Sequence, residues 1–182
     1  MQMNDSIERV LITEEEIQTA VRRMADDISR DYEGKNLVLL GILKGSVVFM
    51  GDLMKRLSIP VQIDFMKVSS YGSGTTSKGL VDIILDIRRK DLGNCDILII
   101  EDIIDSGKTL SYLAKYLKEK GARSVRTCTM LDKPSRREVE FQPDYSGFEI
   151  PDEFVIGYGL DYDEKFRALP FVGILKREIY EK

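Results

Sequence analysis

A group of acidic, hydroxyl and glycine residues occupies positions 101–109 of the sequence. Glu101, Asp102 and Asp105 precede a turn, 106–109, that consists of Ser, Gly, Lys and Thr. Three carboxylates within five positions repel one another unless a cation lies among them. A glycine and hydroxyl groups at a helix start can hold a phosphate, because backbone amides there are unpaired. The stretch therefore predicts a phosphate-binding turn with carboxylates beside it.

Two further stretches place a lysine directly after a predicted strand. Lys44 precedes Gly45, and Lys133 precedes Pro134. Considered alone, each is explained at least as well as an exposed loop lysine. The sequence contains no histidine. Acid–base chemistry near neutral pH must therefore use Asp, Glu, Lys, Tyr or a metal-bound water.

The elements that must position these residues alternate between strands and helices. The apolar run 97–100 predicts a strand buried on both faces, and the helical spacing of apolar residues from Leu110 to Leu117 predicts a helix after the turn. Ligands of open α/β sheets bind beyond the carboxyl ends of the strands, where this turn lies. Further strands are predicted at 37–43, 59–68, 80–85, 125–131, 171–175 and from 154, and helices from a capping box at Thr13 and Glu16 to Arg30 and from 46 to 57.

Two other interpretations of the 101–109 stretch were weighed. The nucleotide-binding P-loop, G-x-x-x-x-G-K-[ST], matches Gly107, Lys108 and Thr109, but its first glycine position is Asp102. A carboxylate there would repel the phosphates that such a loop surrounds, which argues against a P-loop. The simpler interpretation is a strand–turn–helix joint with solvated acids, and the mutual repulsion of the three carboxylates weakens it.

The composition is that of a globular protein without a nucleic-acid-binding surface. The 182 residues are 43% hydrophobic and 32% charged, and the formal net charge is -4. This length suits one well-buried domain. The two cysteines, Cys95 and Cys128, have no metal-site spacing and are expected to be reduced thiols of a cytoplasmic protein. No stretch resembles a signal peptide or approaches membrane-spanning length, so we expect neither secretion nor a membrane partner.

The stretch 101–109 resembles the phosphoribosyl-pyrophosphate (PRPP) binding motif of type I phosphoribosyltransferases, and residues 11–176 resemble the bacterial hypoxanthine(-guanine) phosphoribosyltransferases. The narrower matches are Leu43-Lys44-Gly45, Ser69-Ser70-Tyr71-Gly72, Leu131-Asp132-Lys133-Pro134, Pro151 to Tyr158, Leu160-Asp161-Tyr162 and Phe166-Arg167. Two positions depart mildly from the family pattern. Ser106 stands where many relatives have Thr, and Ser46 stands where several have Gly.

The resemblance implies an α/β fold of the type I phosphoribosyltransferases, with a mostly parallel central sheet, flanking helices and a small hood subdomain. We expect a single domain over 1–182, with its core at about 10–133 and 170–182. The hood would lie mainly at 135–169, where the pattern predicts largely irregular structure, and could include the N-terminal residues. The family also implies a cis peptide between Leu43 and Lys44.

The resemblance further implies Mg²⁺-dependent purine salvage, in which hypoxanthine or guanine and PRPP give IMP or GMP and pyrophosphate. Asp105 would be the base that accepts a proton from purine N7. By resemblance, PRPP and its 5′-phosphate are bound by Glu101, Asp102, Asp105, Ser106, Gly107, Lys108 and Thr109, and pyrophosphate by Lys44, Gly45 and Arg167. The purine is bound by Lys133, Phe154, Val155 and Asp161, Mg²⁺ by Glu101, Asp102 and Asp161, and a lid over the site carries Ser70 and Tyr71.

Other functions remain open at this point. A regulator could keep this fold and bind PRPP or a nucleotide as a signal, although the net charge of -4 and the single-domain length argue against an RNA- or DNA-binding role. A transferase that prefers xanthine or a pyrimidine would use the same chemistry with a different pocket. The family implies a homodimer or homotetramer.

Overall fold

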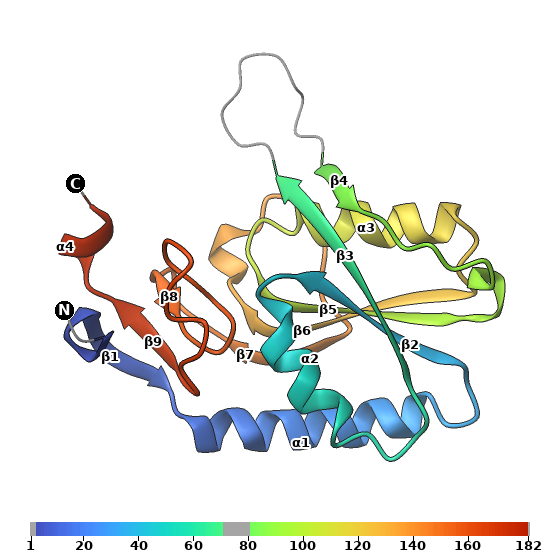
Figure 1. Ribbon diagram of the computed structural model, residues 1–182, viewed down its shortest axis with the longest axis horizontal. Coiled ribbons are helices and arrows are strands. Elements are labelled where there is room, and N and C mark those ends of the chain that lie inside the picture. The colour runs from blue at the N-terminus through green and yellow to red at the C-terminus, as the bar shows by residue number, and fades with distance from the viewer. Residues whose placement is uncertain (1–2, 71–80, 182) are drawn as a thin grey trace.

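The computed structural model describes residues 3–70 and 81–181. Its strands and helices alternate through most of the chain (Figure 1). The strands are β1 Ile7–Ile12, β2 Leu37–Leu43, β3 Gln62–Ser70, β4 Val81–Leu85, β5 Asp96–Ile104, β6 Ser124–Asp132, β7 Tyr145–Glu149, β8 Val155–Ile156 and β9 Val172–Leu175. The helices are α1 Glu14–Asp31, α2 Ser46–Met54, α3 Lys108–Glu119 and α4 Arg177–Tyr180, with 3-10 turns at Met3–Ser6, Leu92–Asn94 and Pro134–Arg136.

A six-stranded sheet forms the centre of the molecule, in the order β4-β3-β2-β5-β6-β7. Its strand pairs are parallel except β3 with β4, so the expected mostly parallel α/β sheet is confirmed. One face packs against α1 and α2 through residues such as Leu39 and Leu98, and the opposite face packs against α3 through Val38 and Ile97. Coverage of both faces explains why β2 and β5 are nearly continuous apolar runs.

The capping box at the start of α1 is present as the sequence predicts. The Thr13 hydroxyl accepts a hydrogen bond from the Glu16 amide at 3.3 Å, and the Glu16 carboxylate accepts one from the Thr13 amide at 2.8 Å. After α3, Gly121 adopts a φ of +94°, the left-handed conformation that ends many helices. These local signals therefore set where both helices begin or end.

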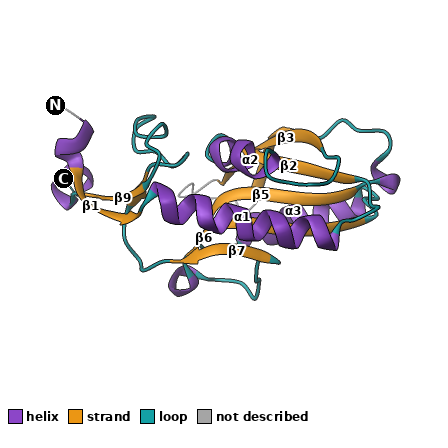
Figure 2. Cartoon of the chain, turned by 90° about the horizontal axis from the view of Figure 1, so that it is seen from below, coloured by secondary structure: helices purple, strands orange, loops and turns teal. Residues whose placement is uncertain are grey.

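A second, three-stranded sheet lies at one end of the molecule, in the order β1-β9-β8, and all its pairs are antiparallel. Both views show β1, β9 and α4 together at this end, beyond the six-stranded sheet (Figures 1 and 2). The sequence grouped 170–182 with the core, whereas β9 pairs with β1 and β8. Apolar periodicity identified β9 as a strand but could not identify its partners, because pairing is a long-range choice.

The segment after Lys133 is less irregular than the sequence predicts. β7 joins the six-stranded sheet at its edge beside β6, with Leu131 opposite Phe148. Its residues are partly buried or exposed, and the strand lacks the continuous apolar run that is typical of an inner strand. Within 135–169, where the hood is expected, Tyr145–Glu149 therefore belongs to the six-stranded sheet. Among the described residues, no helix is long and apolar enough to cross a membrane.

Candidate active site

Strand β5 carries the acidic stretch further than the sequence predicts. β5 continues to Ile104, with Glu101 opposite Thr129 and Ile103 opposite Leu131 of β6. The prediction that the strand ends at Ile100 is wrong, because this pairing with β6 extends it past the acids. Glu101 and Asp102 therefore project from the end of the strand itself, and the turn begins at Asp105.

The turn 105–109 leads into α3 in the way a phosphate-binding turn requires. Gly107 has a φ of +79°, and a Cβ built there would lie 2.9 Å from Arg137 Cδ, so glycine suits this position on two counts. The Lys108 amide donates to the Ser106 hydroxyl at 3.3 Å. The Lys108 ammonium pairs with the Glu138 carboxylate. The first amides of α3 face the turn with no intrahelical acceptor, as at any helix start.

Residues that follow the Lys133 segment support this turn from outside. The Arg137 guanidinium donates to the Asp105 carbonyl at 2.6 Å and pairs with Asp132 at 2.5 Å. The Glu138 amide donates to the Ser106 carbonyl at 3.0 Å. Arg137 thus ties the turn to the end of β6. The sequence did not single it out, and its only signal is a position shortly after Lys133.

The loop at the end of β2 packs tightly against the acids of β5. The Leu43–Lys44 peptide is cis, as the resemblance implies. A Cβ built on Gly45 would lie 1.6 Å from Asp102 Oδ2, so only glycine allows the Asp102 carboxylate to approach this backbone. The Lys44 ammonium bonds the Glu164 carboxylate at 2.9 Å, and both side chains are largely exposed.

A glycine of the loop after β8 closes over the same β2 loop. A Cβ built on Gly159 would lie 2.0 Å from the Gly45 carbonyl oxygen. The Gly159 carbonyl accepts from Arg167 Nη1 at 2.8 Å, and its amide donates to the Arg167 carbonyl at 3.0 Å. Arg167 Nη2 pairs with Asp161 Oδ1 at 2.8 Å. The contacts of Gly159 therefore bring together the predicted pyrophosphate residues Lys44, Gly45 and Arg167, which come from separate parts of the chain.

The two acids on β5, Glu101 and Asp102, both have raised pKa values. Burial and the negative charge of Asp102 raise the pKa of Glu101 well above its ordinary range. Burial also raises the pKa of Asp102. Glu101 Oε2 is buried and has no hydrogen-bond partner among the described residues. Two partly buried, adjacent carboxyl groups with an unused oxygen can accept a cation.

Asp161 does not join these two acids in a single cluster. Its Oδ1 pairs with Arg167 and its Oδ2 accepts from the Glu164 amide at 2.9 Å. In residues 3–70 and 81–181, no group of three or more carboxylate or cysteine side chains is arranged to hold a metal. The predicted metal residues therefore form two places, Glu101 with Asp102 and Asp161 on its own.

Lys133 is a buried cation beside the turn. Its side chain is 10% exposed, which an ordinary surface lysine would not be. Its Nζ donates to the Glu153 carbonyl at 2.7 Å and lies 3.9 Å from Asp105 Oδ1. The next residue after Glu153 is Phe154, whose half-buried ring packs on other aromatic rings. The predicted purine-binding residues Lys133 and Phe154 therefore belong to adjoining segments, with Asp105 nearby.

These elements together match a known family. The family model of the phosphoribosyl transferase domain matches residues 11–163. The chain belongs to the phosphoribosyltransferase family. The chain is similar over nearly its full length to hypoxanthine-guanine phosphoribosyltransferases. A hypoxanthine-guanine phosphoribosyltransferase of Lactococcus lactis is 51% identical over 99% of this chain and 97% of its own length, and that of Bacillus subtilis is 49% identical over 98% and 99%.

A solved structure shares the whole phosphoribosyltransferase fold. The hypoxanthine phosphoribosyltransferase of Staphylococcus aureus superposes with a TM-score of 0.94 at 47% identity, covering 100% of this chain and 98% of that one. A bifunctional protein TilS/HprT of Listeria monocytogenes is also 51% identical over 99% of this chain. The chain spans 28% of the length of that protein.

The lid that the family resemblance implies falls largely outside the described residues. Ser70 is the last residue of β3, and Tyr71 lies in the stretch 71–80 that the structure does not describe. The assignment of both residues to a lid stays a prediction.

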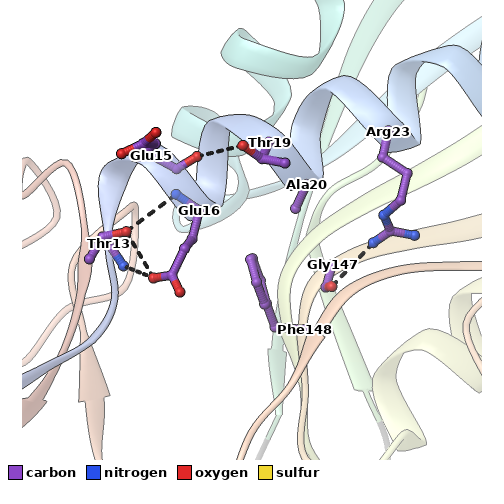
Figure 3. Close-up of a pocket in the computed structure, with 8 residues that line it drawn as sticks. All are labelled: Thr13, Glu15, Glu16, Thr19, Ala20, Arg23, Gly147 and Phe148. Carbon is purple, nitrogen blue, oxygen red and sulfur yellow. Dashed lines mark hydrogen bonds between the residues drawn. The ribbon is translucent and has the colours of Figure 1, made fainter.

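A separate hollow of about 480 Å³ lies between α1 and β7 (Figure 3). Arg23 crosses it and donates to the Gly147 carbonyl at 3.3 Å, with Phe148 and Ala20 on its walls. None of the predicted phosphoribosyltransferase site residues lines it. The hollow is therefore distinct from the site at the end of β5.

Proposed function

We propose that this chain transfers the 5-phosphoribosyl group from PRPP to hypoxanthine or guanine, giving IMP or GMP and pyrophosphate. The observation that supports this most is the position of Lys133 Nζ, 3.9 Å from Asp105 Oδ1 beside the phosphate-binding turn. N7 and O6 lie next to each other on one edge of a 6-oxopurine. A carboxylate and an ammonium at this spacing suit those two atoms together.

The purine end of the reaction then assigns a role to each group. Asp105 accepts the proton that leaves the purine ring, a transfer that typically contributes about 10²–10⁴-fold to the rate. Lys133 donates to the 6-oxo group, so adenine, which carries an amino group there, is rejected. The Phe154 ring stacks on the base, and backbone groups of Val155 and Asp161 bind its edge.

The sugar-phosphate end uses the two loops and the acids of β5. Positive charge develops on the ribose as its C1–O bond breaks, and Glu101 and Asp102 stabilise it. The amides and hydroxyls of the turn from Asp105 to Thr109 hold the 5′-phosphate. Lys44, the backbone at Gly45, and the guanidinium of Arg167 hold the leaving pyrophosphate. The close packing of Gly159 on Gly45 supports a common pyrophosphate subsite.

The residues also fit a magnesium ion carried by PRPP. Mg²⁺ binds through one or two carboxylates and keeps phosphate and water ligands, so the pair Glu101 and Asp102 suffices without a third protein ligand. The unpaired Glu101 Oε2 supports this fit. A magnesium ion held there would supply positive charge to the departing pyrophosphate. Asp161 is proposed as a further carboxylate on the metal side of the site.

Three broader proposals accompany this function. The sheet β1-β9-β8 and the loops attached to β8 form the hood, with Ile7–Ile12 as the N-terminal contribution. The chain acts in the cytoplasm, supported by two free, buried cysteines. It assembles as a homodimer or homotetramer, as the family resemblance implies.

One assay tests the proposed function directly. The protein is incubated with Mg²⁺, PRPP and each of hypoxanthine, guanine, xanthine and adenine, and nucleotide formation is followed by absorbance and chromatography. We expect IMP or GMP to form and adenine to remain unchanged. Transfer to adenine, or no transfer to either hypoxanthine or guanine, would contradict the proposal. Efficient transfer to xanthine alone would favour the xanthine-preferring alternative.

A further inference from the structure

The ring of Phe154 is held between other aromatic side chains. The Tyr180 ring stacks on it, with 4.8 Å between centroids and 23° between planes. The Tyr162 ring meets its edge, at 5.7 Å and 85°. Phe154 itself is half-buried, so part of its ring remains accessible. The orientation of a ring that a flat ligand must contact is therefore set by two tyrosines.

Helix α4, which carries Tyr180, is fixed to the same region by its backbone. The Tyr162 hydroxyl donates to the Ile179 carbonyl at 3.1 Å. The Leu175 amide donates to the Phe154 carbonyl at 2.9 Å, which places the strand before α4 beside Phe154. Phe154, Tyr162 and Tyr180 also pack on one apolar cluster around Ile156. Tyr180 is therefore held in place as a support and is not a side chain that merely rests on the surface.

The two faces of the Phe154 ring have different surroundings. Figures 1 and 2 show α4 at the outer end of the small sheet, and Figure 1 shows β8 between α4 and the six-stranded sheet. Phe154 directly precedes β8, and the Glu153 carbonyl accepts from Lys133 on the side of the six-stranded sheet. Tyr180 thus covers one face of the Phe154 ring. The other face, on which no aromatic ring of the described residues stacks, is the one on which a base can stack.

We propose that Tyr180 is a positioning residue for the purine, and that α4 is part of the purine subsite. This inference rests on the proposed function. Tyr180 holds the plane of the Phe154 ring, so that purine, Phe154 and Tyr180 form three stacked layers. Without the outer ring, the Phe154 side chain gains rotational freedom that must be lost again when a base binds. The affinity for the base then falls, while PRPP binding, which uses other residues, does not change.

The contribution of the Tyr180 ring can be separated from that of its hydroxyl. The hydrogen bonds of the described residues include none from the Tyr180 hydroxyl, whereas the Tyr162 hydroxyl is bonded. Tyr180→Phe keeps the stacked ring, and Tyr180→Leu keeps apolar volume without a ring. Tyr112 gives a matched control, because it stacks on Tyr116 within α3 at 6.0 Å and 11°, and neither residue belongs to the proposed site.

The test compares Michaelis constants for the two substrates in the full-length protein. Stacked aromatic pairs contribute enough that Tyr180→Ala and Tyr180→Leu should raise the KM for hypoxanthine roughly 2- to 12-fold. The KM for PRPP should stay within about twofold, and Tyr180→Phe and Tyr112→Ala should match the wild type. Equilibrium binding of hypoxanthine in the presence of pyrophosphate should weaken by the same factor.

Several results would overturn the inference. An unchanged or lowered KM for hypoxanthine in both Tyr180→Ala and Tyr180→Leu would do so, and so would an equal rise in the KM of both substrates. Tyr180→Phe behaving like Tyr180→Ala would show that the ring is not the cause. Should Tyr180→Ala not fold, the Tyr180→Leu and Tyr180→Phe pair decides. A wild-type protein that transfers to no purine would instead refute the proposed function, and this inference with it.

Discussion

The close contact between Gly159 and the Gly45 carbonyl provides the most specific test of how the two loops of the site are held together. Replacing Gly159 with alanine adds a Cβ 2.0 Å from the Gly45 carbonyl oxygen, where real Cβ contacts are not found below 3.0 Å. Both atoms belong to or are fixed by the backbone, so no side-chain rotation relieves the collision. The loop after β8 and the loop after β2 must therefore separate by about 1 Å, the difference between these two distances.

The size of the effect follows from that displacement. The β2 loop carries Lys44 and lies against Asp102, so its movement misplaces groups proposed for pyrophosphate and the metal. A misplacement of about 1 Å can cost on the order of 10²-fold in rate. Gly159 also has a φ of +101°, so alanine there strains the backbone by roughly 1–2 kcal/mol. The variant should lose about 100-fold in kcat/KM and only a few degrees in Tm.

A second glycine separates these two effects. Gly121 has a φ of +94° and nothing within 4 Å of a built Cβ, so Gly121→Ala has a similar backbone strain and no collision. IMP formation at varied PRPP and thermal unfolding are measured for both variants. Gly121→Ala should lose a similar amount in Tm and keep its activity. Wild-type kcat/KM in Gly159→Ala, or equal losses of activity in both variants, would refute the reasoning.

Three further changes have defined outcomes. Asp105→Asn should lower turnover by about 10²–10⁴-fold while PRPP still binds in equilibrium dialysis; normal turnover would exclude Asp105 as the base. Lys133→Ala should raise the KM for hypoxanthine or weaken discrimination against adenine in competition assays. Burial raises the pKa of Asp96, but hydrogen bonds from Arg123 and Ser124 outweigh burial and hold this pKa below the ordinary value of an aspartate. This carboxylate stabilises the fold above about pH 4 and stops doing so as pH falls through its lowered pKa. Asp96→Asn should therefore lose stability at pH 7 and flatten the acid limb of a Tm–pH curve.

Features that depend on neighbouring residues could be predicted from the sequence. The capping box at Thr13, the buried strand β2 and the start of α3 after Gly107 all follow from local chemistry and apolar spacing. The predicted sheet was correct because buried parallel strands are apolar on both faces. The turn 105–109 was predicted for the same reason, since a helix start with glycine and hydroxyl groups is a local pattern, and the binding role of its residues stays a prediction.

Features that depend on distant residues were not predictable. Nothing local indicates that β5 continues through Glu101 and Asp102, because its pairing with β6 decides this. Arg137, which supports the phosphate turn, and Tyr180, which stacks on Phe154, have no motif of their own. Their roles appear only when contacts across the fold are known. Sequence reasoning therefore identified groups proposed to touch substrate better than the groups that hold them.

The supporting contacts of the hood show why this matters for function. The Tyr158 hydroxyl donates to Asp52 Oδ2 at 3.0 Å, and Gln18 donates to the same oxygen at 3.0 Å. Tyr158 thus ties the loop after β8 to α2, while α1 holds the same carboxylate. The next residue, Gly159, packs on the loop that begins α2. Both contacts lie where the proposed hood meets the core. The helices α1 and α2 therefore set the distance between Arg167 and the acids of β5. In the proposed function, a hood fixed at its base would keep the groups proposed for pyrophosphate in register, while its outer part, with Tyr180, would position the purine.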